Sequence, residues 1–315
     1  MKKILVISEM TSDQKEELKK LAPQYAITRE INSEDAAVEI VYGYNEDFEE
    51  AFKEGFEGVR WIQFPFAGVN QLPLALFKES GVLLTNGSGI HAGSMTEIIF
   101  GHILSYTRNF KELILNQENN FLYYTDWSFD LTGKKFLIIG MGKIGSAVGK
   151  VAQAFGMKVI GVNRSGRDVA HAEKIYPIER LSEILPEADI VLNLLPLTDE
   201  TIHFSDEKLF NEMKKGVIFI NMGRGGSVVT DDLVDALHSD QVAFAGLDVF
   251  EEEPLPADHP LWDMEQVTIS PHIGGVVENY DELLFAILRD KIQACQQDKE
   301  LPVNLVDLEK GDLFA

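Results

Sequence analysis

The stretch that decides the fold is LIIGMGKIGSAVGKVAQAFGMKVIGVNRSGR, residues 137–167. Three apolar residues lead directly into Gly140, and a complete G-x-G-x-x-G pattern follows over residues 140–145. Apolar side chains then recur three or four residues apart as far as Phe155, which is the spacing of a helix face. A second apolar segment, residues 159–162, closes the unit. The order strand, glycine turn, helix, strand predicts the first half of a dinucleotide-binding fold rather than a glycine turn that serves packing alone.

The glycine turn also predicts where a pyrophosphate would bind. Gly140 permits the tight turn, Gly142 lets the backbone approach the pyrophosphate, and Gly145 lets the helix lie close to the strand. Lys143 and Ile144 lie at the start of that helix, whose free N–H groups attract phosphates. All five residues are therefore predicted to bind the cofactor.

The composition limits the possible partners. The chain has 315 residues, of which 45% are hydrophobic, enough for about two domains with full cores. Its net charge of −23 argues against nucleic acid or an anionic membrane surface as a partner. The single cysteine, Cys295, cannot form an internal disulfide, which favours a cytoplasmic location. The apolar run at residues 4–7 is too short for a signal peptide, and no run reaches the about 18 residues of a membrane span.

Short apolar strands alternate with helical stretches, which predicts an α/β protein with two doubly wound parallel sheets. Strands are expected at residues 4–7, 25–28, 38–42, 61–64, 82–85, 136–139, 159–162, 190–194, 217–221, 243–247 and 267–270. We expect a flavodoxin-like substrate domain, residues 1–98 plus 286–315, with an inserted Rossmann domain, residues 99–285. Residues 109–130 show no clear period and are interpreted as an arm that packs on another subunit, with Trp127 as an interface anchor or an ordinary surface anchor. Residues 301–306 are expected to return to the first domain, and Thr230 is expected to cap a helix at 231–237.

Three charged residues follow apolar strands in the second half of the chain. Arg224 lies in NMGRGG, Glu253 in DVFEEEP and His272 in SPHIGG. A histidine beside a carboxylate can carry a proton near neutral pH, and an arginine can hold a carboxylate through two parallel hydrogen bonds. With a nicotinamide, these groups suit reduction of a 2-keto acid.

Each of the three residues also has a plainer interpretation. Arg224 alone would be a solvated surface arginine, Glu253 part of a charged loop, and His272 a loop histidine with its hydrogen bonds satisfied. Their combined position after three strands, downstream of the glycine turn, favours the catalytic interpretation. The other histidines lack a comparable setting, and their spacing gives no zinc pattern, so no metal is predicted: His91, His102, His171, His203, His238 and His259.

Five motifs in a fixed order carry a family resemblance. They are Gly140-x-Gly142-x-x-Gly145, Asn193-Leu-Leu-Pro196-Leu-Thr198-x-x-Thr201, Asn221-x-Gly-Arg224-Gly, Leu247-Asp248-Val-Phe-x-x-Glu253-Pro254 and Pro271-His272-Ile-Gly274-Gly275. With them, the chain resembles the D-isomer-specific 2-hydroxyacid dehydrogenase family, and most of all its glyoxylate/hydroxypyruvate reductase group. The loop around Ala67 and Gly68 matches the family's substrate loop more loosely, because Asn70 stands where aspartate is commoner.

The resemblance implies a role for each matched residue. Arg224 would bind the substrate carboxylate and carbonyl oxygen, His272 would be the acid/base, and Glu253 would hold His272. Backbone N–H groups near Ala67 and Gly68 would take the carboxylate, with the active site in the cleft between the domains and the chain in a homodimer. Asp248 would meet the nicotinamide amide, among the residues that line the cofactor: Leu195, Pro196, Thr201, Met222, Gly223, Asp248 and Gly274.

The end of the second strand predicts the choice of cofactor. In the NAD form of this fold an acidic residue, about 20 residues beyond the glycine turn, binds the ribose hydroxyls. Here Asn163 occupies that place, and Arg164, Ser165 and Arg167 follow. Two guanidinium groups and a hydroxyl suit a 2′-phosphate, so NADP(H) is expected to be preferred, with NAD(H) possible. The alternative is a solvated basic turn that tolerates either nucleotide.

Two other functions stay open at this point. A dinucleotide-sensing binding protein could share the fold, since fold does not determine function. A D-3-phosphoglycerate dehydrogenase is a further alternative, although the first domain shows no evident basic cluster for a phosphate.

Overall fold

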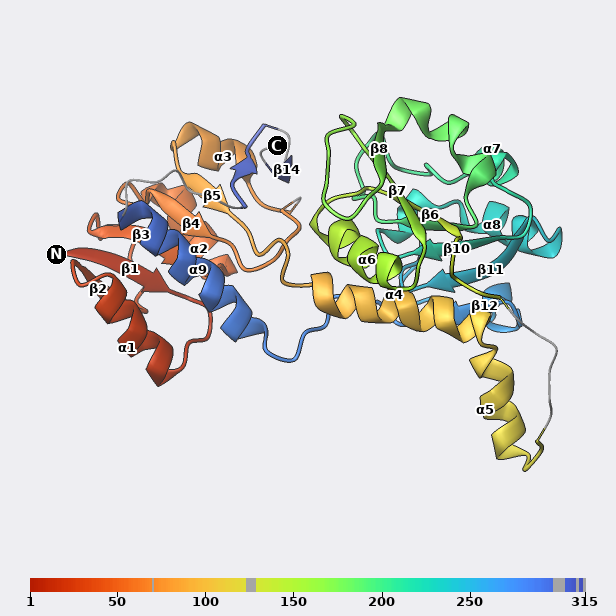
Figure 1. Ribbon diagram of the computed structural model, residues 1–315. Helices are drawn as coiled ribbons and strands as arrows, with labels where there is room; N and C mark the ends of the chain where they lie inside the picture. Colours follow the sequence, from red (N-terminus) through yellow and green to blue (C-terminus); the bar gives the residue numbers. More distant parts are fainter. Residues whose placement is uncertain (70, 123–128, 297–303, 310–311, 314–315) are drawn as a thin grey trace. The chain divides into compact units, whose positions relative to one another are not determined.

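The computed structural model describes residues 1–69, 71–122, 129–296, 304–309 and 312–313 (Figure 1). The chain forms two compact units, Met1–Ile90 with Val277–Ala315, and His91–Val276. These boundaries precede the predicted ones, 98/99 and 285/286, because helix α4 (Ala92–Thr107) packs as a whole on the second unit and α9 (Tyr280–Gln296) on the first. Asn70 and Trp127 lie outside the described residues.

The first unit is built on a parallel sheet of five strands in the order β2-β1-β3-β4-β5. Its strands are β1 (Lys2–Val6), β2 (Tyr25–Thr28), β3 (Val38–Tyr42), β4 (Trp61–Gln63) and β5 (Leu83–Thr85). Its helices are α1 (Ser12–Leu21), α2 (Glu46–Gly55), α3 (Leu74–Glu79) and α9. The order 2-1-3-4-5 is that of flavodoxin-like folds, as the sequence predicts.

The second unit is built on a parallel sheet of seven strands in the order β12-β11-β10-β9-β6-β7-β8. Its strands are β6 (Lys135–Ile139), β7 (Lys158–Asn163), β8 (Lys174–Pro177), β9 (Ile190–Asn193), β10 (Val217–Asn221), β11 (Val242–Leu247) and β12 (Val267–Ile269). Its α-helices are α4, α5 (Phe110–Glu118), α6 (Lys143–Ala154), α7 (Glu207–Glu212) and α8 (Thr230–His238). The strand order reverses between β6 and β9, which is where this fold binds dinucleotides, and the predicted Rossmann domain is confirmed.

The central strands of the second sheet are apolar along most of their length. Residues 136–139, 190–192 and 217–220 have no exposed surface, because apolar clusters pack on both faces of the sheet. A strand buried on both faces reads as a continuous apolar run, and this is why the sequence locates these strands well.

Three local predictions differ from the structure. The arm at residues 109–130, in which the sequence shows no clear period, contains α5, a helix of nine residues with no buried side chain. Strand β8 was not predicted, since its pattern KIYP sits at the sheet edge and is only half buried. Thr230 is the first residue of α8 rather than its cap, because the preceding Val229 carbonyl accepts the first helical hydrogen bond.

The predicted return of the chain to the first unit is seen in its described residues. Leu305 forms an antiparallel bridge with Thr85, and Val306 is buried in the first unit's core. Val306–Asp307 (β13) also pairs with Asp312–Leu313 (β14). Within the parts of the chain that the structure describes, no helix combines the length and apolar character needed to cross a membrane.

Candidate active site

The glycine turn joins β6 to α6 at the point where the strand order reverses. Gly140 has a φ of +85°, and a Cβ there would stand 2.9 Å from the Leu194 carbonyl carbon in the loop after β9. A Cβ on Gly142, the N-cap of α6, would meet only the Gly140 carbonyl oxygen at 3.9 Å. The backbone at this helix N-terminus is therefore open to a ligand, and the residues present fit a pyrophosphate. Lys143 is exposed and Ile144 half-buried beside it.

The loop after β7 is closed by the side chain of Asn163. Its Oδ1 accepts from the Gly166 N–H at 2.7 Å, and its Nδ2 donates to the Arg167 carbonyl at 2.9 Å. Arg164, Ser165 and Arg167 are all exposed on this turn. The asparagine thus shapes the loop that carries the predicted phosphate-binding residues.

The loops after β9 and β10 lie against each other. A Cβ on Gly223 would stand 2.5 Å from the Leu195 carbonyl oxygen, so Leu195 and Gly223 are in backbone contact. Thr201 Oγ1 donates to the Pro196 carbonyl at 2.6 Å and closes the turn that begins there. Met222 touches Gly274, since a Cβ on that glycine would stand 2.5 Å from the Met222 Cε. The structure therefore brings Leu195, Gly223, Met222 and Gly274 to one edge of the sheet.

Arg224 is exposed at the end of β10, and hydrogen bonds through Ser227 hold its backbone. Ser227 Oγ donates to the Arg224 carbonyl at 2.6 Å, and the same hydroxyl accepts from Asn193 Nδ2 at 2.8 Å. The guanidinium makes one bond with its own loop, from Nη1 to the Gly223 carbonyl at 2.8 Å. The next residue, Gly225, lies close to the loop that follows β11, here called the β11 loop. A Cβ on Gly225 would stand 1.8 Å from the Phe250 carbonyl oxygen.

Glu253 and His272 form the pair that the sequence predicts. Glu253 Oε2 lies 2.7 Å from His272 Nδ1, and Glu253 Oε1 accepts from the Phe250 N–H at 2.9 Å. The carboxylate is thereby fixed in its own loop while it orients the imidazole. Nδ1 faces the carboxylate, so Nε2 is the ring nitrogen that remains to take another partner.

Asp248 holds the loop that carries His272. It is 3% exposed, Oδ1 accepts from Ser270 Oγ at 2.5 Å and from the Ile273 N–H at 3.0 Å, and Oδ2 accepts from the Gly274 N–H at 2.8 Å. His272, whose φ is +53°, donates its N–H to the Asp248 carbonyl at 2.8 Å. A non-glycine residue in this left-handed region needs such support from its surroundings.

Glu251 is a structural residue that the sequence analysis did not single out. Its Oε2 accepts from the Thr230 N–H at 2.6 Å, at the N-terminus of α8, and its Oε1 lies 3.1 Å from His203 Nε2. The β11 loop is thus tied to the start of α8, where a carboxylate is favourable. In the sequence it is one of three consecutive glutamates, and nothing local distinguishes their roles.

The predicted substrate loop belongs to the first unit. Asn86 Nδ2 donates to the Ala67 carbonyl at 2.7 Å, Gly87 N–H donates to the Phe66 carbonyl at 3.0 Å, and the Tyr280 hydroxyl donates to the Pro65 carbonyl. Gly68 is exposed and Ala67 half-buried. The loop after β4 is thus held by residues from both segments of the first unit.

Comparisons with known proteins point to one family. Residues 100–274 match the model of the "D-isomer specific 2-hydroxyacid dehydrogenase, NAD binding domain" family. Glyoxylate reductase of Aeropyrum pernix is 33% identical over 77% of this chain and 74% of its own length, and hydroxypyruvate reductase of Blautia hydrogenotrophica is 30% identical over 88% of both. The crystal structure of a D-isomer-specific 2-hydroxyacid dehydrogenase family protein from Aeromonas salmonicida aligns with a TM-score of 0.78, at 30% identity, over 98% of this chain and 99% of that one.

The contact of Gly225 with the β11 loop gives a test of the site's construction. We expect Gly225→Ala to lower kcat/KM about tenfold or more, because the new methyl group forces apart the loops that carry Arg224 and Glu253. Gly226→Ala is the matched control, since its Cβ would meet only the Leu197 methyl groups at 3.4 Å. Steady-state kinetics of both variants make the comparison, and equal activity of the two would contradict the expectation.

Proposed function

The chain belongs to the D-isomer-specific 2-hydroxyacid dehydrogenase family, and we propose that its substrates are glyoxylate and hydroxypyruvate. It is an NAD(P)-dependent oxidoreductase that transfers a hydride between nicotinamide and a small 2-keto or D-2-hydroxy acid. The observation that carries the substrate proposal is the Glu253–His272 pair beside the Arg224 loop, in a chain similar to reductases of these two acids. Its single cysteine also leads us to propose a cytoplasmic location.

Three side chains would perform the reduction. A nicotinamide held at the glycine turn would supply the hydride that the keto carbon takes up. Arg224 holds the substrate carboxylate and faces the carbonyl oxygen, where it stabilises the negative charge that develops. His272 gives its Nε2 proton to that oxygen, and Glu253 at 2.7 Å stabilises the charged imidazole before the transfer. The backbone N–H groups of Ala67 and Gly68 are proposed as further carboxylate ligands.

The test is turnover with glyoxylate and hydroxypyruvate, followed by the loss of reduced-nicotinamide absorbance. We expect His272→Gln to lower kcat by roughly 10²- to 10⁴-fold, because proton transfer is lost. The dissociation constant of the cofactor should stay unchanged, since the glycine turn is intact. Near-normal turnover by His272→Gln would remove this residue from the mechanism.

The same assay separates the alternatives. Turnover confined to 3-phosphohydroxypyruvate would make the chain a phosphoglycerate dehydrogenase. Tight dinucleotide binding without turnover of any 2-keto acid would favour a sensor.

We propose that the enzyme prefers NADPH to NADH. Asn163 carries no negative charge to repel a 2′-phosphate, and the turn that it closes holds Arg164, Ser165 and Arg167 exposed at the end of β7. This is the strand end where the adenosine ribose lies in Rossmann folds. Guanidinium groups grip a phosphate with charge-assisted hydrogen bonds, which supports the proposal.

Substitution of Arg164 tests the cofactor preference. We expect Arg164→Ala to lower kcat/KM for NADPH about tenfold to a hundredfold, because a hydrogen bond to a charged group contributes roughly 1.5–3 kcal/mol. Its kcat/KM for NADH should change little. Arg29→Ala, which removes an exposed arginine of the first unit, is the control. Equal or better use of NADH by the wild-type enzyme would refute the preference.

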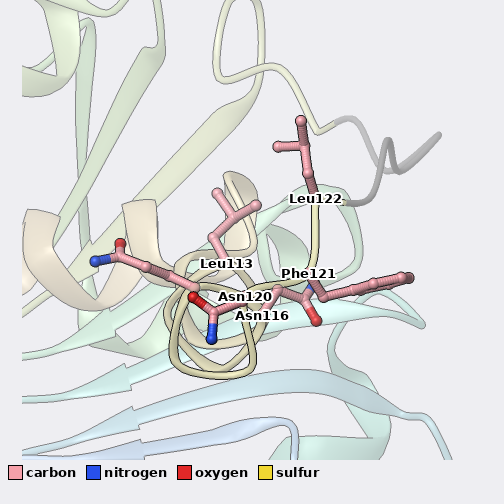
Figure 2. A pocket seen from close by; sticks show the side chains of 6 residues that line it. Leu113, Asn116, Asn120, Phe121 and Leu122 are labelled. Carbon is pink, nitrogen blue, oxygen red and sulfur yellow. The ribbon is translucent and has the colours of Figure 1, made fainter.

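We also propose that the chain forms a homodimer through α5. Six large apolar side chains on and after this helix are exposed: Phe110, Leu113, Ile114, Leu115, Phe121 and Leu122. The exposed fraction reaches 84% for Leu122. Figure 2 shows part of this surface, where Leu113, Phe121 and Leu122 line a shallow pocket with Asn116 and Asn120. Exposed apolar side chains gathered on one short segment are typical of a protein interface, and a second copy of the chain would cover them symmetrically.

The oligomeric state tests this interface. We expect the wild-type chain to run as a dimer in size-exclusion chromatography with light scattering, and Leu113→Asp to shift it to a monomer. The matched control is Leu283→Asp on α9, because the two leucines are 42% and 40% exposed and both lie on helices. A wild-type monomer, or a dimer that survives Leu113→Asp, would contradict the proposal.

A further inference from the structure

His102 is a buried histidine of the second unit, and a glycine on the adjacent strand makes room for its ring. It lies on α4, is 7% exposed, and its ring faces the strands at the β11–β12 edge of the sheet. A Cβ on Gly246 of β11 would stand 2.6 Å from the His102 Cβ and 2.8 Å from its Cγ. The glycine therefore provides the space that the imidazole fills.

Both ring nitrogens of His102 are hydrogen-bonded. Nδ1 lies 2.6 Å from Thr268 Oγ1, and Nε2 lies 3.1 Å from Ser270 Oγ. Thr268 and Ser270 are two residues apart in an extended segment, so their side chains point to the same face. The Ser270 hydroxyl continues to Asp248 Oδ1 at 2.5 Å, which links α4 to the carboxylate that holds the His272 loop.

The donor in each of these hydrogen bonds can be assigned by starting from Asp248. The Ser270 hydroxyl donates its single proton to Asp248, whose two oxygens act only as acceptors in this loop. Ser270 must then accept from His102, which places a proton on Nε2. In a neutral imidazole Nδ1 is the acceptor, and Thr268 donates to it. Burial lowers the pKa of His102, against a smaller opposing effect of the Asp248 charge, and this favours the neutral ring.

We propose that His102 is a positioning residue for the reaction. Its Nε2–H fixes the Ser270 hydroxyl on Asp248, and Asp248 in turn holds the backbone of residues 272–274 in the strained form that presents the His272 side chain. His102 touches neither substrate nor cofactor in this scheme. The inference rests on the proposed acid/base role of His272 and adds a residue from another element to its support.

Two substitutions at position 102 separate the roles of the ring nitrogens. The amide of glutamine reaches the place of Nε2 and can donate to Ser270, whereas asparagine reaches only the place of Nδ1. We expect His102→Asn to lower kcat about tenfold, with KM and the cofactor dissociation constant little changed, because a loosened loop misplaces the proton donor. His102→Gln should recover most of this loss, and Ser270→Ala should reproduce it, with no further loss in the double variant.

Thr107→Val is the matched control for a change inside α4. Thr107 is fully buried on the same helix, and among the described residues its hydroxyl has no hydrogen-bond partner. This variant should keep the wild-type kcat. If His102→Asn has lower thermal stability but wild-type kcat per cofactor-binding site, His102 is merely structural and the proposal fails.

A spectroscopic measurement tests the proposal without turnover. In protein labelled with ¹⁵N-histidine, the His102 ring signals are those that disappear in His102→Gln. We expect them to show a protonated Nε2 and a bare Nδ1 in the resting enzyme. A proton on Nδ1, or a doubly protonated ring, would overturn the proposed chain of hydrogen bonds. Because this result does not depend on catalysis, it stays separate from an error in the role of His272, which would appear as activity in His272→Gln.

Discussion

The parallel arrangement of the second sheet is the constraint on which the proposed chemistry depends. Because β9, β10, β11 and β12 all run in one direction, the loops at their carboxyl ends lie side by side at one edge. Arg224, Glu253 and His272 come from three of these loops, which are far apart in the sequence. The loops also touch through their backbones, as at Gly225 and Phe250, which brings the Arg224 loop against the Glu253 loop. The sheet therefore supplies the proximity, and the close loop contacts supply the precision.

The features predicted well from the sequence are those that depend on a pattern of neighbouring residues. Continuous apolar runs such as residues 217–221 give the strands of a doubly buried sheet, and the spacing of glycines at 140–145 gives the turn before α6. The Glu253–His272 pair could be expected because both residues follow strands that a parallel sheet places together. The elements with a weak sequence pattern were not predicted. They are the half-buried edge strand β8 and the exposed helix α5.

Long-range polar contacts could not be predicted from the sequence. Thr230 looked like a helix cap, yet the carboxylate at the N-terminus of α8 comes from Glu251, 21 residues further along the chain. The sequence around His102 gave no sign of a role, because its two hydrogen-bond partners lie 166 and 168 residues further along the chain. The signals that could have found it were the glycine inside strand β11 and the alternation of Thr268 and Ser270 before His272. Neither has a meaning until the fold places α4 against that strand.

Asn163 shows how the hydrogen bonds of a turn can decide which residue stands at a strand end. Its Nδ2 donates to the Arg167 carbonyl, a bond that an aspartate could not make, so the shape of the turn already demands an amide. The absence of an acidic residue here thus follows from the hydrogen bonds of the loop, whichever cofactor binds. The residues that favour the proposed 2′-phosphate are therefore those that this turn presents. On a chain of net charge −23, a loop that exposes Arg164 and Arg167 within four residues provides the local positive charge that an anionic ligand needs.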